Sequence, residues 1–549
     1  MAVPPWALVT LSFRELGRGM DKAGAYVDRL MPNSAELAKQ AAMSYLFNLP
    51  VDGALKKDGW AVIFQLDPAA TQTDNERAFI LCTADAAAMK TALIGAYGVP
   101  KEEAGILTFT LPQPVPQPDK ILAVKLAGGK VLAAPSVPFL AKLEDYLASN
   151  PGGPFGKLAA DATPPDAVLT LKISALKRDF GGMLETSLAE AARLAAPGAA
   201  EAARLNARLS DWLESFWELD AIEARLEVDA SGARASLEIL AMPEPQSELA
   251  EIFALPATPT SGQLLSLLPG DAACLATWNM NGTQLVDWLS DEFENHNQAG
   301  QKEAEAVRKL LSFLSLASGE GALAVSGSGS TGGAFLLALQ AQDPAKAAPS
   351  LAAVFEALGS LLAAANSPHV QLKALPAEDR AGIALQRYQA AGPVEVSQAW
   401  SGLMGWPLGL QYALSNDTVL LSTGRQGLDA LKQALSDVKT LKGRQDAGAP
   451  NAGAPKGIFP GLAAGTFALV LVHPVRLARL GLATLPPESL AAAAEITAGI
   501  PDVPLAISMR QDKNVVALRL ELPAAVPQAA YTLAHRLRSV NASHATPAP

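Results

Sequence analysis

The chain has 549 residues, of which 50% are hydrophobic and only 6% aromatic, and its formal net charge is -11. A chain of this length predicts a folded protein of two to four domains. The acidic balance, without a cluster of Lys and Arg, disfavours nucleic-acid binding. No stretch reaches the roughly 18 uninterrupted apolar residues of a transmembrane helix. The two cysteines, Cys82 and Cys274, are too few for a disulfide framework or a zinc site, and we expect buried free thiols.

The N-terminal half reads as strands and helices that end in one long hairpin. Alternating apolar residues indicate the strands, and apolar residues at helical spacing indicate the helices. A segment rich in Gly and Pro, residues 150–166, separates a first unit from a smaller second one. Strands are predicted at 6–13, 60–66, 78–83, 105–111, 167–173, 221–229 and 233–241, helices at 14–30, 34–47, 85–98, 175–217 and 248–253, and a hairpin followed by a helix at 121–147.

The C-terminal half repeats this order of elements. Residues 256–262 separate the halves, and residues 443–460 take the place of the earlier linker. The run Phe335-Leu336-Leu337 aligns with Phe79-Ile80-Leu81. Strands are predicted at 272–280, 322–327, 334–340, 383–390, 466–472, 503–510 and 515–522, helices at 285–294, 303–316 and 343–362, and a second hairpin followed by a helix at 409–435.

The clearest sign of repetition is that residues 121–147 align with residues 409–435 without a gap. Each segment contains a two-residue turn of residue types that tolerate positive φ, Gly128-Gly129 and Asn416-Asp417. The pattern predicts an α+β fold that arose by tandem duplication, with mainly antiparallel sheets and helices on one face of each. The expected domains are 1–149 and 164–255, their repeats 265–442 and 458–540, and a disordered tail at 541–549.

Two features suggest chemistry, but each has a simpler structural interpretation. Gly327, Gly329 and Gly332 form a GxGxxG motif, yet the residues after it read as a strand, so we interpret it as a hairpin loop and not as a dinucleotide site. The five histidines lack any metal-ligand spacing. Among them His473 ends an apolar strand just before Pro474, and a capping or hydrogen-bonded role is favoured over that of a ligand or base. We therefore predict no catalytic residue, no metal site and no cofactor.

Tryptophans are the best candidates for a binding surface. Trp212 and Trp217 lie close together at the end of a predicted long helix, where one can be buried and the other partly exposed, and Trp288 lies in the predicted helix 285–294. Large aromatic side chains suit sugar or peptide surfaces, although they more often anchor a core. We take Trp212, Trp217 and Trp288 as the candidate binding surface.

The openings LLPGDAACLATWNMNGTQLVDWL and PPDAVLTLKISALKRDFGGML pair a proline and an acidic residue with a strand and then a helix. A later strand and turn pattern occurs in each half, in the segments KVLAAPSVPFLAKL and TVLLSTGRQGLDAL. In these features the chain resembles a loose group of uncharacterised exported bacterial proteins with duplicated α+β halves. The resemblance covers most of the chain. It implies an envelope-associated protein without assigned catalysis, and no functional residue is carried over from it.

Residues 1–13 show no charged leader and no apolar core of a signal peptide. The low cysteine content, the alanine-rich composition and the proline-rich tail favour a periplasmic or envelope protein in its mature form, with a cytoplasmic location as the alternative. We expect a non-enzymatic scaffold or protein-interaction module, with a protein partner or self-assembly. The first alternative is a carrier that binds an apolar, lipid-like ligand between helices and sheet. A hydrolase is the third interpretation.

Overall fold

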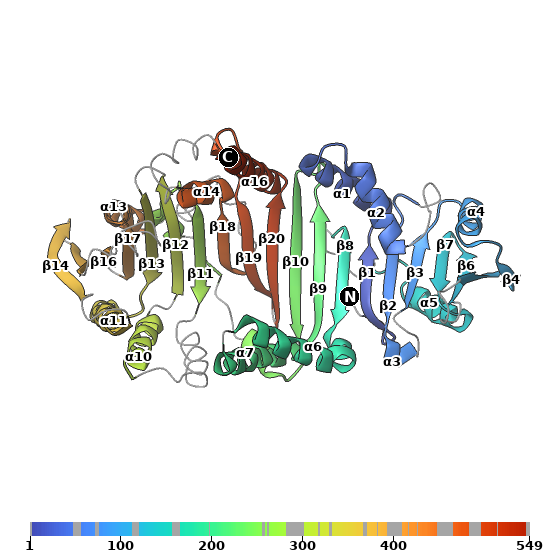
Figure 1. The fold of residues 1–549 in the computed structure, drawn as a ribbon, viewed down its shortest axis with the longest axis horizontal. Coiled ribbons are helices and arrows are strands. Elements are labelled where there is room, and N and C mark those ends of the chain that lie inside the picture. The colour runs from blue at the N-terminus through green and yellow to red at the C-terminus, as the bar shows by residue number, and fades with distance from the viewer. Residues whose placement is uncertain are drawn as a thin grey trace, which may run out of the picture. The chain divides into compact units, whose positions relative to one another are not determined.

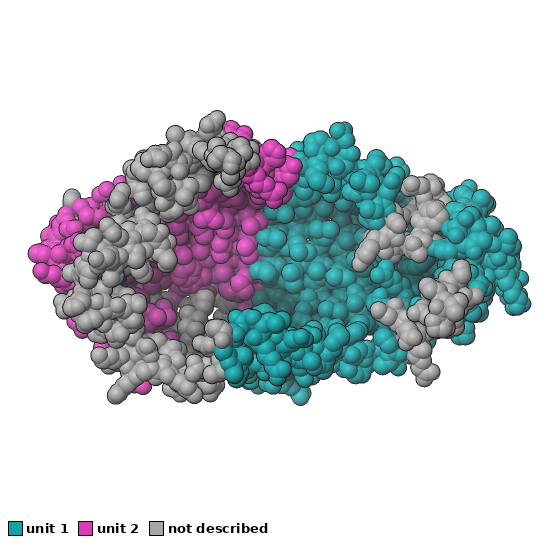
Figure 2. Space-filling view, in the orientation of Figure 1, with its two compact units in different colours: residues 1–255, 513–524 teal, residues 256–512, 525–549 magenta. Residues whose placement is uncertain are grey.

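The computed structural model describes residues 3–47, 56–71, 76–111, 120–155, 165–196, 198–254, 259–260, 263–280, 301–316, 319–328, 332–365, 371–380, 383–391, 409–415, 417–424, 426–446, 465–482, 496–512 and 514–544. The chain divides into two compact units, each described here by itself (Figures 1 and 2). Unit 1 contains residues 1–255 and 513–524, and unit 2 contains residues 256–512 and 525–549. Within the described residues, no helix combines the length and apolar character that a membrane span requires.

Antiparallel strands form the sheet of unit 1. They are β1 (Ala7–Phe13), β2 (Ala61–Leu66), β3 (Arg77–Cys82), β4 (Lys101–Glu103), β5 (Ile106–Leu111), β6 (Lys120–Ala127), β7 (Lys130–Ala134), β8 (Ala167–Lys172), β9 (Leu219–Val228), β10 (Arg234–Pro243) and β20 (Val515–Pro523). The strands pair in the order β4-β5-β6-β7-β3-β2-β1-β8-β9-β10-β20. The sheet of the N-terminal half is therefore completed by a strand from the C-terminal part of the chain.

Helices cover both faces of this sheet, which corrects the expectation of helices on one face. They are α1 (Leu16–Leu30), α2 (Ala35–Phe47), α3 (Pro68–Thr71), α4 (Ala86–Tyr97), α5 (Val137–Ser149), α6 (Ile173–Ala195), α7 (Ala199–Trp217) and α8 (Glu248–Ala254). Leu16 of α1 and Met89 of α4 pack against Ile63 of β2. Leu143 of α5 packs in a cluster with Phe64 of β2. Neighbouring residues of a strand point to opposite faces, so these two cores lie on opposite sides of the sheet.

Unit 2 is built on strands that pair in a matching order. They are β11 (Cys274–Met280), β12 (Gly319–Ser328), β13 (Gly332–Gln340), β14 (Gln371–Arg380), β15 (Ile383–Ala391), β16 (Gly409–Ser415), β17 (Thr418–Gly424), β18 (Thr466–Val472) and β19 (Leu505–Asp512). The pairing order is β14-β15-β16-β17-β13-β12-β11-β18-β19. This order matches that of unit 1 strand by strand: β14 corresponds to β4, β15 to β5, and so on along the sheet to β19, which corresponds to β9.

The helical elements of unit 2 also pack on both faces of their sheet. They are η1 (Leu264–Leu267), α10 (Gln301–Leu316), α11 (Pro344–Ala365), α13 (Gly427–Asp446), α14 (Pro474–Leu482) and α16 (Ala525–His544). Leu431 of α13 shares a core cluster with Ala338 of β13. Phe355 of α11 shares another with Leu339, the next residue of that strand. A third cluster joins α14 and α16 through Val475 and Leu533.

The two predicted hairpin-helix segments are confirmed. Ala127 pairs with Lys130 around the Gly128-Gly129 turn, whose residues have φ of 57° and 70°. Ser415 pairs with Thr418 around the second two-residue turn. Each hairpin is followed by a helix, α5 or α13, whose leucines at corresponding positions, Leu143 and Leu431, are fully buried. In the first hairpin, positive φ at both turn residues is the geometry of a type I′ turn, which the Gly-Gly pair predicts.

Other predictions were shifted or incomplete. The ladder between β13 and β17 places Leu337-Ala338-Leu339 at the positions of Phe79-Ile80-Leu81, two residues beyond the sequence alignment. The strands β4 and β14 and the helix α16 were not predicted. Helix α16 continues to His544, so the expected tail begins at least four residues too early. The predicted helix 285–294 lies outside the described residues.

Candidate binding face

The most unusual surface of unit 1 is an apolar sheet face that is only partly covered. The register aligns Leu169 of β8, Ala224 of β9, Ile239 of β10 and Leu518 of β20 in one row across four strands. The next row on the same face carries Ala167, Leu226, Leu237 and Leu520. Leu169, Leu226 and Leu518 keep 40%, 38% and 37% of their surface exposed. We call this surface, made by the two rows, the apolar face.

Helices cover the two ends of the apolar face and leave its middle open. At one end, α6 and α7 pack in a cluster that includes Leu171 and Ile222, the next row on the same face. At the other end, the Tyr26 hydroxyl of α1 donates a 3.2 Å hydrogen bond to the carbonyl oxygen of Leu522. Figure 2 shows unit 1 hollowed between these two sets of helices, whose positions Figure 1 labels. The exposed leucines therefore form the floor of a trough.

The opposite face of the same strands is polar and more deeply buried. Thr170, Glu223 and Glu238 are exposed by 1%, 2% and 8%. The Arg225 guanidinium lies 2.7 Å from Glu223 and 3.6 Å from Glu238. Burial raises the pKa of the Glu223 carboxyl, but the net shift is downward, and the Arg225 ion pair contributes to it. A sheet with one buried and one solvated face normally buries its apolar side, and in these strands this order is inverted.

The tryptophans predicted as a binding surface do not act together. Trp212 on α7 is 79% exposed, whereas Trp217 on the same helix is 5% exposed and packs in the α6–α7 core. Five residues of helix separate two side chains by about 140° around the axis, which explains why one faces solvent and the other the core. Trp217 is therefore wrong as a surface residue. Trp288 lies outside the described residues.

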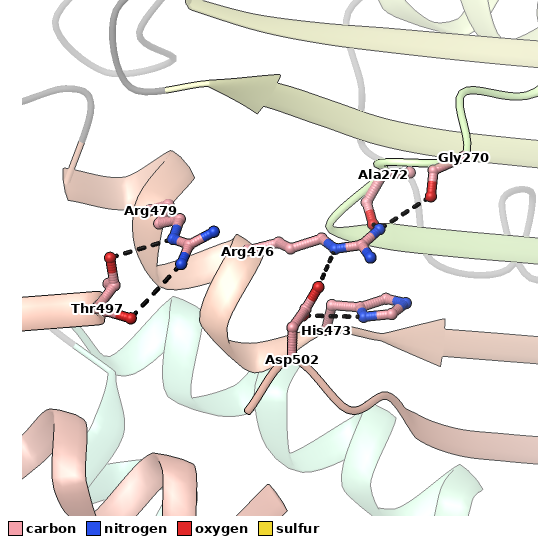
Figure 3. Close-up of polar contacts among 7 residues, drawn as sticks. All are labelled: Gly270, Ala272, His473, Arg476, Arg479, Thr497 and Asp502. Atoms are coloured by element: carbon pink, nitrogen blue, oxygen red, sulfur yellow. Dashed lines mark hydrogen bonds and ion pairs between the residues drawn. The ribbon is translucent and has the colours of Figure 1, made fainter. Parts of the chain in front are cut away.

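In unit 2, a polar cluster surrounds His473, which is 6% exposed (Figure 3). Its Nδ1 lies 3.1 Å from a carboxylate oxygen of Asp502. Arg476, one turn along in α14, donates a 2.6 Å hydrogen bond to the other oxygen of Asp502 and further bonds to the carbonyl oxygens of Gly270 and Ala272. The cluster thus ties α14 to the segment before β11 and to the segment before β19. This is the hydrogen-bonded role that the sequence favoured for His473.

Electrostatics favour the neutral form of the His473 imidazole. Burial and the neighbouring Arg476 lower the pKa of the imidazole, and the Asp502 carboxylate only partly opposes them. Burial raises the pKa of Asp502, but the net shift is downward, because the hydrogen bond and charge of Arg476 and the hydrogen bond with His473 outweigh burial. A neutral histidine beside an ionised aspartate is one part of a hydrolytic triad, but every hydrogen bond described here holds main-chain segments together. We assign the cluster a structural role.

A pH titration tests this assignment. In the unfolded chain His473 regains its ordinary pKa and binds a proton more readily than in the folded chain, so this histidine reduces stability as pH falls from about 7 to about 5. His473→Asn keeps a donor for Asp502 and cannot titrate. Its free energy of unfolding should therefore fall less than that of the wild type over this range. Equal pH dependence of the two proteins would contradict the lowered pKa.

The remaining sequence motifs carry no site. Gly327 and Gly332 of the GxGxxG motif lie in the paired strands β12 and β13, as a hairpin requires, while residues 329–331 lie outside the described residues. Cys82 and Cys274 are free but only half-buried, not fully buried as expected, and burial raises the pKa of both thiols. Within the described ranges, no three His, Cys, Asp or Glu side chains gather in a way that could hold a metal ion.

The chain shows no significant similarity to a protein-family model, to a curated protein or to a solved structure.

Proposed function

We propose that the protein is a non-enzymatic interaction module and that the apolar face of unit 1 binds a protein partner. The observation that carries the proposal is the exposure of Leu169, Leu226 and Leu518 on a sheet whose polar face is the buried one. An apolar surface with exposed leucines in two neighbouring rows is a typical core for a protein interface. The trough between α1 and α6–α7 restricts access to partners that fit between these helices (Figure 2).

The second candidate is a carrier of an apolar, lipid-like ligand, and one observation favours it. The floor of the trough is built from leucine, isoleucine and alanine side chains, and helices border it at both ends. Apolar side chains with few polar groups also line typical lipid sites. A protein partner is preferred because a solvent-open sheet face does not enclose an acyl chain as a carrier would.

The matching strand orders support the proposal that the two halves arose by tandem duplication. In both units the hairpin with its following helix occupies the same place in the strand order, β6-β7-α5 and β16-β17-α13. A shared order of strands with the same register at the hairpins is hard to obtain by independent origin. We further propose a periplasmic or envelope location, which rests on the resemblance of the halves to exported bacterial proteins.

Native mass spectrometry of protein purified from its own host tests the binding proposal, because it separates a bound protein from a bound lipid by mass. Leu226→Glu places a charge at the centre of the apolar face and should weaken binding of the partner by at least about tenfold, since burying one leucine contributes about 1.5–3 kcal/mol. Leu194→Glu is the matched control, because Leu194 on α6 is 83% exposed and lies outside the apolar face.

A protein mass lost in Leu226→Glu and kept in Leu194→Glu supports the interaction module. A lipid mass with the same pattern supports the carrier instead. If both variants retain the same bound species as the wild type, the apolar face is not the binding surface.

A further inference from the structure

The edge of unit 1 is closed by a strand that unit 1 holds without a direct chain connection. Strand β20 pairs with β10 through eight residue pairs, from Arg234 opposite Pro523 to Ala241 opposite Val516 (Figure 1). The residues directly before and after 513–524 belong to unit 2. Within unit 1, therefore, only hydrogen bonds and side-chain contacts hold the strand. A sheet edge that receives an extended segment in this way has the geometry of β-augmentation.

Specific side-chain contacts fix the register of β20. Arg519 lies opposite Glu238 in the ladder, and its guanidinium also lies 3.8 Å from Glu227, 3.2 Å from Glu521 and 3.5 Å from the Ser236 hydroxyl. Arg225 of β9, Glu238 of β10 and Arg519 thus form a transverse row of alternating charge. Opposite charges directly across a ladder stabilise the pairing, and like charges oppose it.

Two further contacts fix the end of the segment. The amide of Ala524 donates a 2.8 Å hydrogen bond to the carbonyl oxygen of Ala233. The Tyr26 hydroxyl donates to the carbonyl oxygen of Leu522. A segment displaced by two residues would offer other backbone groups to Ala233 and Tyr26, and it would move Arg519 away from Glu238. The contacts along β10 therefore favour one register of the bound strand, in addition to its alternating apolar pattern.

The charged row also distinguishes β20 from β10 itself. Aligning the sequences of the two strands so that Leu237 and Ile239 match Leu518 and Leu520 places Glu238 at the position of Arg519. In the ladder, Leu237 and Ile239 lie opposite Leu520 and Leu518. The ladder is therefore symmetric around the pair Glu238 and Arg519, with a leucine or isoleucine on each side of both residues. If a second β10 took the place of β20, Glu238 would lie opposite another Glu238 on a buried face. Arginine at position 519 removes this repulsion.

We propose that the edge of β10 is a strand-acceptor site for an extended segment with alternating apolar residues and a central arginine, and that it can take residues 513–524 from a second copy of the chain. In the finished chain the site is filled by the chain's own strand. The inference concerns the edge of the sheet and its backbone groups, so it stands independently of the binding proposed for the apolar face.

Peptide binding to the full chain tests the acceptor site. Residues 513–524 are replaced by a Gly-Ser sequence of equal length, and binding of a labelled peptide of residues 513–524 is followed by fluorescence anisotropy. This variant should bind the peptide at least about tenfold more tightly than the wild type, whose site is filled. A peptide carrying Arg519→Glu, and a peptide of residues 234–243, should each bind about tenfold more weakly than the native peptide. Equal binding of the native and Arg519→Glu peptides, or no binding by the folded variant, would overturn the proposal.

A second experiment keeps the proposal testable if the replaced chain does not fold. Leu237 and Leu520 lie directly opposite each other, so full-length Leu237→Cys and Leu520→Cys proteins are unfolded, mixed, refolded together and oxidised. A strand taken from a second copy gives a covalent dimer of one protein of each kind. The control mixes Leu194→Cys with Leu520→Cys and accounts for random oxidation and for the native thiols. If the opposed pair yields no more mixed dimer than this control, the site does not accept the strand from a second copy.

Discussion

Replacing Gly232 by alanine is expected to destabilise unit 1 by about 3 kcal/mol. Gly232 lies in the turn between β9 and β10 with a φ of 65°. A Cβ there would lie 2.6 Å from the carbonyl carbon of Ala25 and 2.6 Å from the amide nitrogen of Tyr26. These are backbone atoms of helix α1, which cannot rotate away as a flexible side chain can. The left-handed conformation and the clash therefore add, and denaturant unfolding measures their sum.

The matched control is Gly128→Ala in the turn between β6 and β7. Gly128 also has a positive φ of 57°, but a Cβ at this position meets no atom within 4 Å. Only the conformational cost remains, about 1 kcal/mol. Hydrogen exchange should show faster opening of β9 and β10 in Gly232→Ala than in the control. Similar losses in both variants would mean that α1 is not held close to the β9–β10 turn.

Replacing Arg476 by alanine is expected to destabilise unit 2 by about 2–4 kcal/mol. The change removes the 2.6 Å bond to Asp502 and the bonds to the carbonyl oxygens of Gly270 and Ala272. Three parts of the chain lose their common partner, and of the two side chains described here as contacting Asp502, only His473 remains. Arg476 also lowers the pKa of His473, so the pKa of this histidine should rise in the variant. Denaturant unfolding and an NMR titration of His473 measure the two effects.

Arg479→Ala is the control for Arg476. Arg479 is on the same helix, and among the described residues it hydrogen bonds to Thr497, with distances of 3.1 Å and 3.5 Å. We expect a loss of about 1 kcal/mol and no change in the titration of His473. Arg476→Lys keeps the charge but cannot reproduce the planar set of donors, so its stability should lie between the wild type and Arg476→Ala. An unchanged pKa of His473 in Arg476→Ala would contradict the geometry of the cluster.

Local patterns in the sequence were sufficient where the structure depends on neighbouring residues. The pair Gly128-Gly129 requires only a chain that accepts positive φ, and the hairpin forms there as predicted. The burial of Leu143 and Leu431 follows from helical spacing, because each helix must place one stripe on the sheet. Tolerance of positive φ and the spacing of apolar residues in a helix are properties of a short segment, so they can be predicted from the sequence directly.

The covering of the faces could not be predicted in the same way. Alternation in β9 and β10 predicts one apolar and one polar face, and the ordinary inference is that the apolar one is buried. Instead Glu223 and Glu238 are more buried than Leu226, because which face a neighbouring element covers depends on distant parts of the chain. The same reason explains Trp212 and Trp217, since either could have faced the core.

The partner of β10 was the largest structural feature outside the reach of sequence patterns. Residues 515–522 were predicted as a strand, but nothing in their alternation indicates pairing with residues 234–241. The charges that specify this pairing, Glu238 and Arg519, resemble ordinary exposed residues of a strand until the register is known. Their role depends on a contact between residues almost 300 positions apart, which no local window contains.

The late position of β20 in the chain has a consequence for synthesis on the ribosome. The nascent chain exposes β10 long before residues 513–524 exist, and translation at roughly 5–20 residues per second leaves this edge unpaired for more than about ten seconds. An unpaired strand edge on a nascent polypeptide is a site where chaperones bind and where neighbouring chains on one polysome can pair and aggregate. Completion of unit 1 thus waits for synthesis of the second half of the chain, and the rate of translation through that half sets how long the exposure lasts.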